Sequence, residues 1–184
     1  LAVLALASGP APALAAPAIV LPPDPSSYIS PYPISSADLS VTISPTGTDD
    51  YDTLQYVFDS MANKPGASIY LAAGTFHTRY QLVLGDFDGT LQGAGRDATL
   101  LQAGLAGQRM KLLDAADMKV FNPTGIPSLI VTRQSVSGGT QVHLTLLDLT
   151  LQSTDAPGYT GVINTKPHGN IGLQALLLVS GFWQ

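Results

Sequence analysis

Short apolar runs punctuated by glycine occupy the middle of the chain, and they limit what it can fold into. These runs cover residues 68–71, 75–78, 80–84, 90–92 and 99–102. Strands of this length, with turns every few residues, are typical of a sandwich, a barrel or a solenoid. The strong helix formers are scarce, since Glu is absent and Lys and Arg total 8, while Gly and Pro number 18 and 14. Composition therefore favours β structure as well.

One segment, which follows Gly47, has the pattern of a helix. Its apolar stripe is Leu54, Val57, Phe58 and Met61. This i, i+3, i+4, i+7 spacing puts the four side chains on one helix face. Thr48 or Asp49 can cap the first turn, and Asp50 and Asp52 lie near the positive end of the helix dipole. The helix is expected to end before Pro65.

The segment 141–152 has the clearest strand pattern. Apolar and polar residues alternate along it, and the phase of the alternation changes between Leu146 and Leu147. No turn sequence separates the two phases, so a bend or a bulge that keeps both apolar rows inward is expected there.

Three regions are expected along the chain. Residues 1–15 are expected to be a truncated signal peptide, because an apolar run precedes the small-x-small sequence 13–15. Prolines interrupt this run well short of the roughly 20 residues that a bilayer span needs, so no stable membrane span is expected. Residues 16–45, rich in Pro, Ser and Ala, are expected to form an extended spacer.

Residues 46–184 are expected to be the N-terminal portion of a larger β domain. The final segment, 171–184, is an apolar, strand-like run that stops without a polar residue to close it. An open apolar edge of this kind favours aggregation and is normally covered, so we expect truncation at the C-terminus.

Charge and cysteine content exclude several functions. The net charge is −5, and eight scattered cations do not provide the basic face that nucleic-acid binding needs. The chain has no cysteine, which excludes disulfides, thiolate chemistry and cysteine-ligated metal centres.

Three motifs between residues 46 and 102 occur in a familiar order: Gly47–Asp50, Ile69–Phe76 and Gly93–Thr99. Together they resemble the N-terminal coils of the pectate-lyase-like right-handed parallel β-helix superfamily. The resemblance implies an all-β fold, a right-handed parallel β-helix (solenoid) with an N-terminal capping α-helix. It also implies a protein that is secreted, at the cell surface or periplasmic, with a polysaccharide as its partner.

The same resemblance leaves the chemistry open. In the superfamily that the chain resembles, the hydrolases use a set of Asp residues on adjacent coils. The lyases use calcium-binding carboxylates together with a basic residue. The chain has no Asn-Thr-Asp, Gly-His-Gly or Arg-Ile-Lys sequence, and Pro167 precedes His168 where the family has Gly. No catalytic residue can be assigned, no cofactor is evident, and calcium is implied by the resemblance alone. A pectin-type polysaccharide lyase or glycoside hydrolase is the first hypothesis, and a non-catalytic surface or adhesion protein is the alternative.

Two groups of acids have both a functional and a structural interpretation. Asp49, Asp50 and Asp52 can be interpreted as a calcium loop, but no further acid follows at the required spacing, and helix capping explains them better. Asp86 and Asp88 form a carboxylate pair suited to acid–base catalysis, but flanking glycines favour a turn.

Two further patterns have the same double interpretation. Residues 93–98 match a dinucleotide-binding fingerprint with Asp114 as the ribose ligand, but the following residues have strand character where the fingerprint needs a helix. A sugar-binding groove is suggested by polar residues on two neighbouring stretches. These residues are His143, Asp148, Lys166, His168 and Asn170. Alternation alone also predicts a polar face there, and the three histidines form no metal set.

Overall fold

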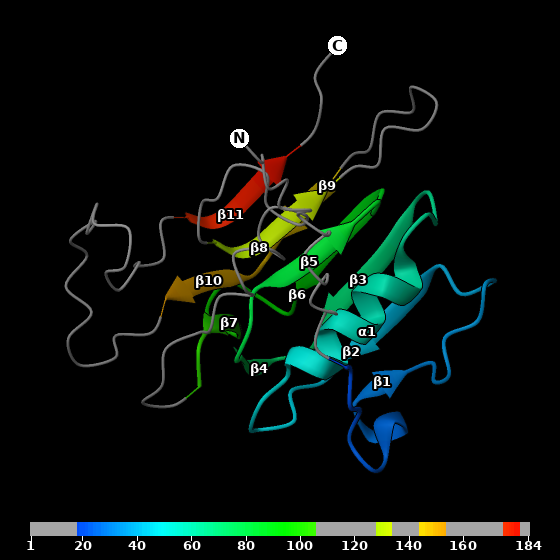
Figure 1. Ribbon diagram of the computed structural model, residues 1–184, viewed down its shortest axis with the longest axis horizontal. Coiled ribbons are helices and arrows are strands. Elements are labelled where there is room, and N and C mark those ends of the chain that lie inside the picture. Colours follow the sequence, from blue (N-terminus) through cyan, green and yellow to red (C-terminus); the bar gives the residue numbers. More distant parts are fainter. Residues whose placement is uncertain (1–17, 106–127, 134–143, 154–174, 181–184) are drawn as a thin grey trace, which may run out of the picture.

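The computed structural model describes residues 18–105, 128–133, 144–153 and 175–180 (Figure 1). The predicted signal peptide, residues 1–15, lies outside them. In chain order the elements are η1 (Pro25–Ser27), β1 (Ile29–Ser30), β2 (Ser40–Ile43), α1 (Tyr51–Met61), β3 (Ala67–Leu71), β4 (Gly74–Thr78), β5 (Leu82–Gly85), β6 (Gly89–Gly93), β7 (Thr99–Ala103), β8 (Ser128–Arg133), β9 (Leu144–Leu147), β10 (Thr150–Ser153) and β11 (Ala175–Ser180).

These strands form three sheets. A five-stranded sheet has the order β1-β2-β3-β6-β9, and two three-stranded sheets have the orders β10-β7-β4 and β11-β8-β5. From β3 onward, consecutive strands pass from one sheet to the next, so hydrogen-bonded neighbours come from distant parts of the sequence. All of these later pairings are parallel, whereas β1 and β2 pair antiparallel.

The helix prediction is confirmed, and α1 belongs to the core. Its predicted apolar stripe, Leu54, Val57, Phe58 and Met61, is fully buried. The side chain of Gln55 ties the helix to β5, because its amide nitrogen donates to the Val83 carbonyl at 2.9 Å and its oxygen accepts the Val83 N–H at 3.0 Å. This exchange satisfies backbone groups of β5 that would otherwise lack a partner in the core.

The prediction of an all-β, right-handed parallel β-helix is wrong. The described strands form one mixed sheet, in which β1 and β2 pair antiparallel, and two parallel sheets, with an α-helix packed into the same core. The physical reason lies at the N-terminal side of the domain. Ile29, Val41 and Ile43 are buried there, so β1 and β2 join the large sheet, and α1 packs beside β5 through its buried stripe.

The segment expected to be an extended spacer contains both of these strands. Residues 18–45 include η1, β1 and β2, and β2 pairs with β3 in register from Ser40 opposite Ser68 to Ile43 opposite Leu71. The Pro-rich composition therefore accompanies backbone that is hydrogen-bonded to the sheet.

The bend predicted within residues 141–152 is confirmed, slightly later than the phase change. Strand β9 ends at Leu147, Asp148 has a φ of 52°, and β10 begins at Thr150. Leu144, Leu146, Leu149 and Leu151 pack against the core. Leu147 is instead 44% exposed, so the second apolar row does not point entirely inward.

Close approach of two strands at Gly89 provides a test of the register. A Cβ atom at Gly89 would collide with the carbonyl oxygen of Ala67 on β3, which is backbone and cannot move aside. We expect Gly89→Ala to lower the free energy of unfolding by about 1–3 kcal/mol, as overpacking does. A Cβ atom at Gly85 would meet no other heavy atom within 4 Å, so Gly85→Ala is the matched control.

The two variants are to be compared by urea denaturation. Gly85→Ala should leave the unfolding free energy within about 0.5 kcal/mol of the wild type, as surface changes usually do. Equal stability of the two variants would contradict the register of β3 and β6.

Candidate functional site

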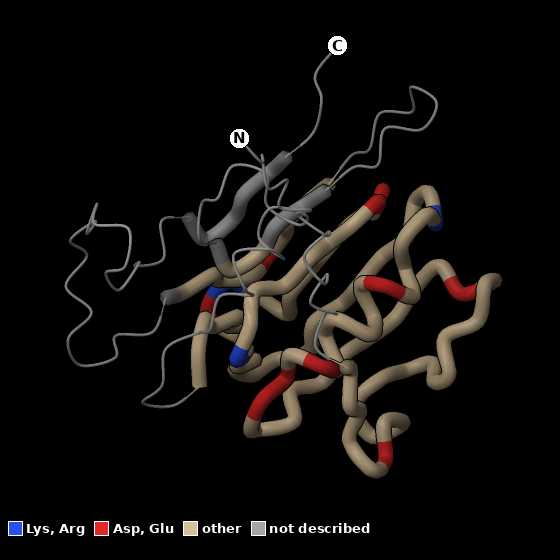
Figure 2. The backbone as a smooth tube through the Cα atoms, in the orientation of Figure 1, with Lys and Arg blue, Asp and Glu red and all other residues tan. Residues whose placement is uncertain are grey.

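The described charges avoid the strands. Apart from Arg133 at the end of β8, no described strand contains Lys, Arg or Asp. Figure 2 shows the charged positions in turns, loops and the helix. Two arrangements of polar side chains result, one around the start of α1 and one on the outside of the large sheet.

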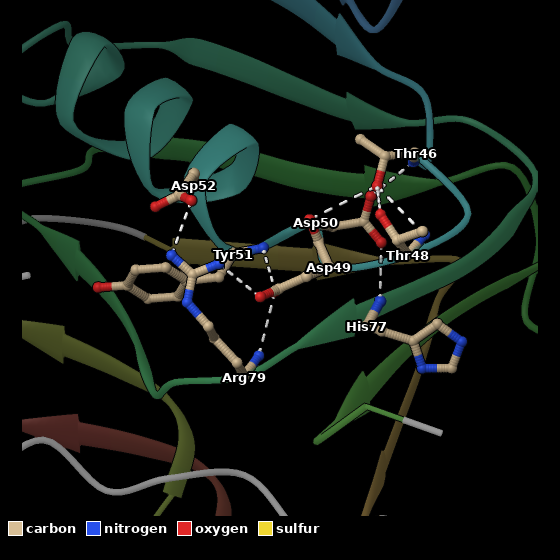
Figure 3. Close-up of polar contacts among 8 residues, drawn as sticks. All are labelled: Thr46, Thr48, Asp49, Asp50, Tyr51, Asp52, His77 and Arg79. Atoms are coloured by element: carbon tan, nitrogen blue, oxygen red, sulfur yellow. Dashed lines mark hydrogen bonds and ion pairs between the residues drawn. The ribbon is translucent and has the colours of Figure 1, made fainter. Parts of the chain in front are cut away.

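The first arrangement is the helix-entry clasp, formed by Asp49, Asp50, Asp52 and Arg79 (Figure 3). Arg79, which follows β4, donates from its guanidinium to the carboxylates of Asp49 and Asp52, the latter at 2.7 Å. Its backbone N–H also donates to Asp49 at 3.2 Å. The Arg79 side chain therefore connects the residues at the start of α1 to the end of β4.

Asp50 is buried and binds the loop that precedes α1 to the end of β4. Its side chain is fully buried and accepts the N–H of Thr46 at 2.6 Å and the N–H of His77 at 2.8 Å. Its own N–H donates to the His77 carbonyl at 2.7 Å. Burial raises the pKa of Asp50 above its ordinary value, although these hydrogen bonds act in the opposite direction.

Capping differs in detail from the sequence-based expectation. Asp50 occupies the N-cap position but makes no capping hydrogen bond with its side chain. Asp49 accepts the N–H of Tyr51, the first residue of the helix, at 3.0 Å. Thr48 does not cap, and its N–H donates to the Thr46 hydroxyl at 3.4 Å. Asp49 therefore satisfies a helix N–H, as the capping interpretation predicts, whereas the Asp50 and Asp52 side chains bind groups outside the helix.

Two aromatic rings cover the cation of the clasp. The Arg79 guanidinium lies 5.2 Å from the ring centroid of Tyr51 and 5.3 Å from that of Tyr80. Burial, together with the nearby acids, raises the pKa of Tyr51 to about 12. Although burial lowers the pKa of Arg79, the hydrogen bonds to Asp49 and Asp52 raise it overall.

The clasp does not fit a calcium ion. Its carboxylates accept hydrogen bonds from backbone N–H groups and from Arg79, whose positive charge repels a cation. Across the described residues, no three His or Asp side chains are grouped as metal ligands.

The predicted carboxylate pair lies in a turn that supports the end of the helix. The Asp86 carbonyl accepts the N–H of Asn63, and the Asp88 carbonyl accepts the N–H of Gly66, both at 2.8 Å. Asp86 has a φ of 47°, a conformation typical of turns. The turn interpretation is therefore confirmed for these two residues.

The glycine-rich stretch 93–98 also forms a turn. It joins β6 to β7, and the residue that follows it, Thr99, begins a strand. The Thr99 hydroxyl accepts the N–H of Ala94 at 2.8 Å and lies 3.1 Å from the Ala72 carbonyl, to which it donates. No helix follows, so the dinucleotide fingerprint has no structural basis. Asp114 lies outside the described residues.

Of the five residues suggested for a sugar-binding groove, the structure describes Asp148. His143, Lys166, His168 and Asn170 lie outside the described residues. Asp148 is exposed at the bend between β9 and β10, and its carboxylate accepts a hydrogen bond from the Gln92 side chain at 3.2 Å. Its carbonyl accepts the N–H of Gly95 at 3.0 Å, which ties this bend to the turn after β6.

Gln92 belongs to the second arrangement, a surface that we name the outer face. It consists of two rows of side chains across β2, β3, β6 and β9. The hydroxyl row contains Ser40, Ser68, Thr90 and Thr145, and the Tyr70 row contains Thr42, Tyr70, Gln92 and Leu147. The residues between them in sequence, including Val41, Ile69 and Leu91, are buried, so the two rows point outward.

Sequence reasoning did not single out Tyr70 or Leu147. Tyr70 is 37% exposed and Leu147 is 44% exposed, and both flank Gln92 in the Tyr70 row. Alternation in β3 puts Tyr70 and Ile69 on opposite faces, which was the available indication that the Tyr70 ring points outward. The position of Leu147 beside Gln92 depends on the pairing of β6 with β9, which no pattern among neighbouring residues in the sequence indicates.

Comparisons with known proteins do not identify the chain. No protein-family model, curated protein or solved structure matches it. The resemblance to the pectate-lyase-like superfamily therefore stays a prediction. Within the described residues, no helix has the length and the apolar character needed to cross a membrane.

Removing the cation of the clasp should destabilise the fold. In Arg79→Met, Asp49 and Asp52 keep their largely buried side chains but lose their charged donor. We expect the free energy of unfolding to fall by about 1–3 kcal/mol, because partly buried carboxylates lose charge-assisted hydrogen bonds. Arg96→Met is the matched control, since Arg96 is exposed in the turn after β6. Equal denaturation midpoints for the two variants would contradict a stabilising role of the clasp.

Asp50 should titrate at a higher pH than an exposed acid. Its pKa is raised above 3.8 by burial, whereas hydrogen bonds from Ser26 and Ser27 lower the pKa of Asp24 below 3.8. Between 3.8 and its folded-state pKa, Asp50 binds more protons in the folded chain, so its contribution to stability decreases as pH rises through that range. Carboxyl ¹³C NMR titration, with Asp50→Asn to assign the signal, measures both values. Titration of Asp50 at or below Asp24 would show this expectation to be wrong.

Proposed function

We propose that this protein is an exported, carbohydrate-active protein that binds polysaccharide on its outer face. The outer face carries the proposal, because it presents hydroxyl, amide and aromatic groups in two rows across four strands of one sheet. Export rests on the predicted signal peptide, and pectin-type lyase or hydrolase chemistry rests on the family resemblance.

The spacing of the outer face suits an extended polymer. Neighbouring strands lie about 4.8 Å apart, so each row offers a side chain at that interval along a line that crosses the strands. The two rows are separated by two residues along each strand, or about 6.6 Å. A chain of sugar rings lying across the strands would therefore meet repeated polar groups on both of its edges.

The chemistry of the two rows matches the two sides of a sugar. Serine and threonine hydroxyls and the Gln92 amide can donate to and accept from sugar hydroxyls. Tyr70 adds an apolar ring with a polar tip, which suits the C–H face of a pyranose and its hydroxyl rim. Leu147 adds an exposed apolar side chain on the other side of Gln92.

A non-catalytic role is the second candidate, and the clasp favours it. The acids at the start of α1 are bound to Arg79 and to backbone N–H groups, so they are not placed to act as acid or base on a substrate. Polysaccharide binding is common to both candidates. Release of reducing ends or of unsaturated products from the same polysaccharides distinguishes them.

Replacing Tyr70 should weaken binding. We expect Tyr70→Ala to raise the Kd for a bound polysaccharide by about tenfold, which corresponds to about 1.4 kcal/mol of lost aromatic contact. Tyr32→Ala is a closely matched control, because Tyr32 has the same exposed fraction of 37% but lies between β1 and β2, where its ring packs 5.9 Å from that of Tyr56. Affinity electrophoresis of the full chain in gels containing each polysaccharide measures the effect. Retardation by none of them, or equal loss in both variants, would overturn the proposal.

A further inference from the structure

We infer that the outer face selects neutral glycans and discriminates against acidic ones. This inference rests on the proposed function and names its substrate class. Among pectin-type polymers it names the methyl-esterified, uncharged form, since free polygalacturonate carries one carboxylate on each sugar.

The outer face contains no charged side chain. Its eight positions hold five hydroxyl-bearing Ser and Thr residues, counted from both rows, together with Tyr70, Gln92 and Leu147. A carboxylate that leaves water to lie on such a surface loses hydration and gains no cation in return, which is unfavourable. Neutral hydroxyls exchange hydrogen bonds with the same side chains at little cost.

Among the described residues, the charges at the β9 edge of the outer face are predominantly negative. Asp148 is exposed at the end of the Tyr70 row, and its carboxylate holds the Gln92 side chain at 3.2 Å. The adjoining turn contributes Arg96 and Asp97, both exposed, and the Gly95 N–H links that turn to the Asp148 carbonyl. Two acids against one base leave this edge with an excess of negative charge.

The other described cations near the helix and its loops are already engaged. The Lys64 ammonium donates to the carbonyls of Ser35 at 2.7 Å and Asp38 at 3.1 Å. Arg79 is held by Asp49 and Asp52 in the clasp. The chain as a whole has a net charge of −5, so an acidic polymer is repelled at long range as well as at the surface.

Polygalacturonate and its fully methyl-esterified form provide the decisive comparison, because they share a backbone and differ in charge. A neutral glucan serves as a third probe. With the full chain at low salt, we expect neutral polymer, esterified or glucan, to bind at least about tenfold more tightly than the free acid. Added salt should narrow that difference, because it screens the repulsion.

Thr90→Lys adds a cation in the centre of the hydroxyl row and should increase binding of the free acid in a salt-dependent way. Thr48→Lys places the same charge on an exposed loop away from the face and is the matched control. Equal or tighter binding of free polygalacturonate by the wild type, with or without calcium, would overturn the inference. If the wild type bound the free acid and Tyr70→Ala weakened this binding, the selectivity would fail but the proposed function would stand. If the wild type bound none of the three polymers, the proposed function itself would be overturned.

Discussion

In-register pairing of strands from distant parts of the chain is the constraint on which the rest of the structure depends. Val41, Ile69 and Leu91 lie side by side on β2, β3 and β6, so one row of apolar side chains fills the core. Because strand side chains alternate, the same register aligns the residues that point outward. A shift of one residue would bury Tyr70 and Gln92 and expose the core row, so packing of the interior fixes the composition of the outer face.

The helix-entry clasp and Gln55 attach α1 to the strands. Arg79 and Asp50 connect the loop before α1 to the end of β4, and Gln55 connects the middle of α1 to β5. These polar groups are partly or fully buried, and nearly all of their hydrogen bonds go to backbone or to an opposite charge. Buried polar groups that are satisfied in this way fix position as well as adding stability. These directional contacts, together with the apolar stripe, therefore fix the position of α1 against the sheets.

Local patterns in the sequence predicted α1 and the strands between residues 67 and 103, whereas long-range pairing could not be read from it. The stripe of α1 and the five runs between residues 68 and 102 follow from periods of 3.6 and 2, which are properties of neighbouring residues. The bond between Gln92 and Asp148 spans 56 positions and depends on which strand lies beside β6. No local pattern specifies that choice.

The fold class was mispredicted for a related reason. Because residues 16–45 are rich in proline, an extended spacer was predicted there. Ile29, Val41 and Ile43 in this segment are instead buried and bring β1 and β2 into the sheet. The resemblance relied on motifs after residue 46 and could not report an antiparallel pair that precedes them. Proline was compatible with sheet formation here because β1 and β2 themselves contain none.

The distribution of charge links the fold to the proposed function. Acids that are fixed by Arg79 and by backbone N–H groups stabilise the entrance to the helix, and the described strands between the turns are left almost without charge. The uncharged outward rows are rich in hydroxyl and amide groups, which can exchange hydrogen bonds with water and with the hydroxyls of a sugar. The proposed selectivity for neutral polymers follows from the same distribution of charge, since the eight residues of the outer face offer a carboxylate no cation.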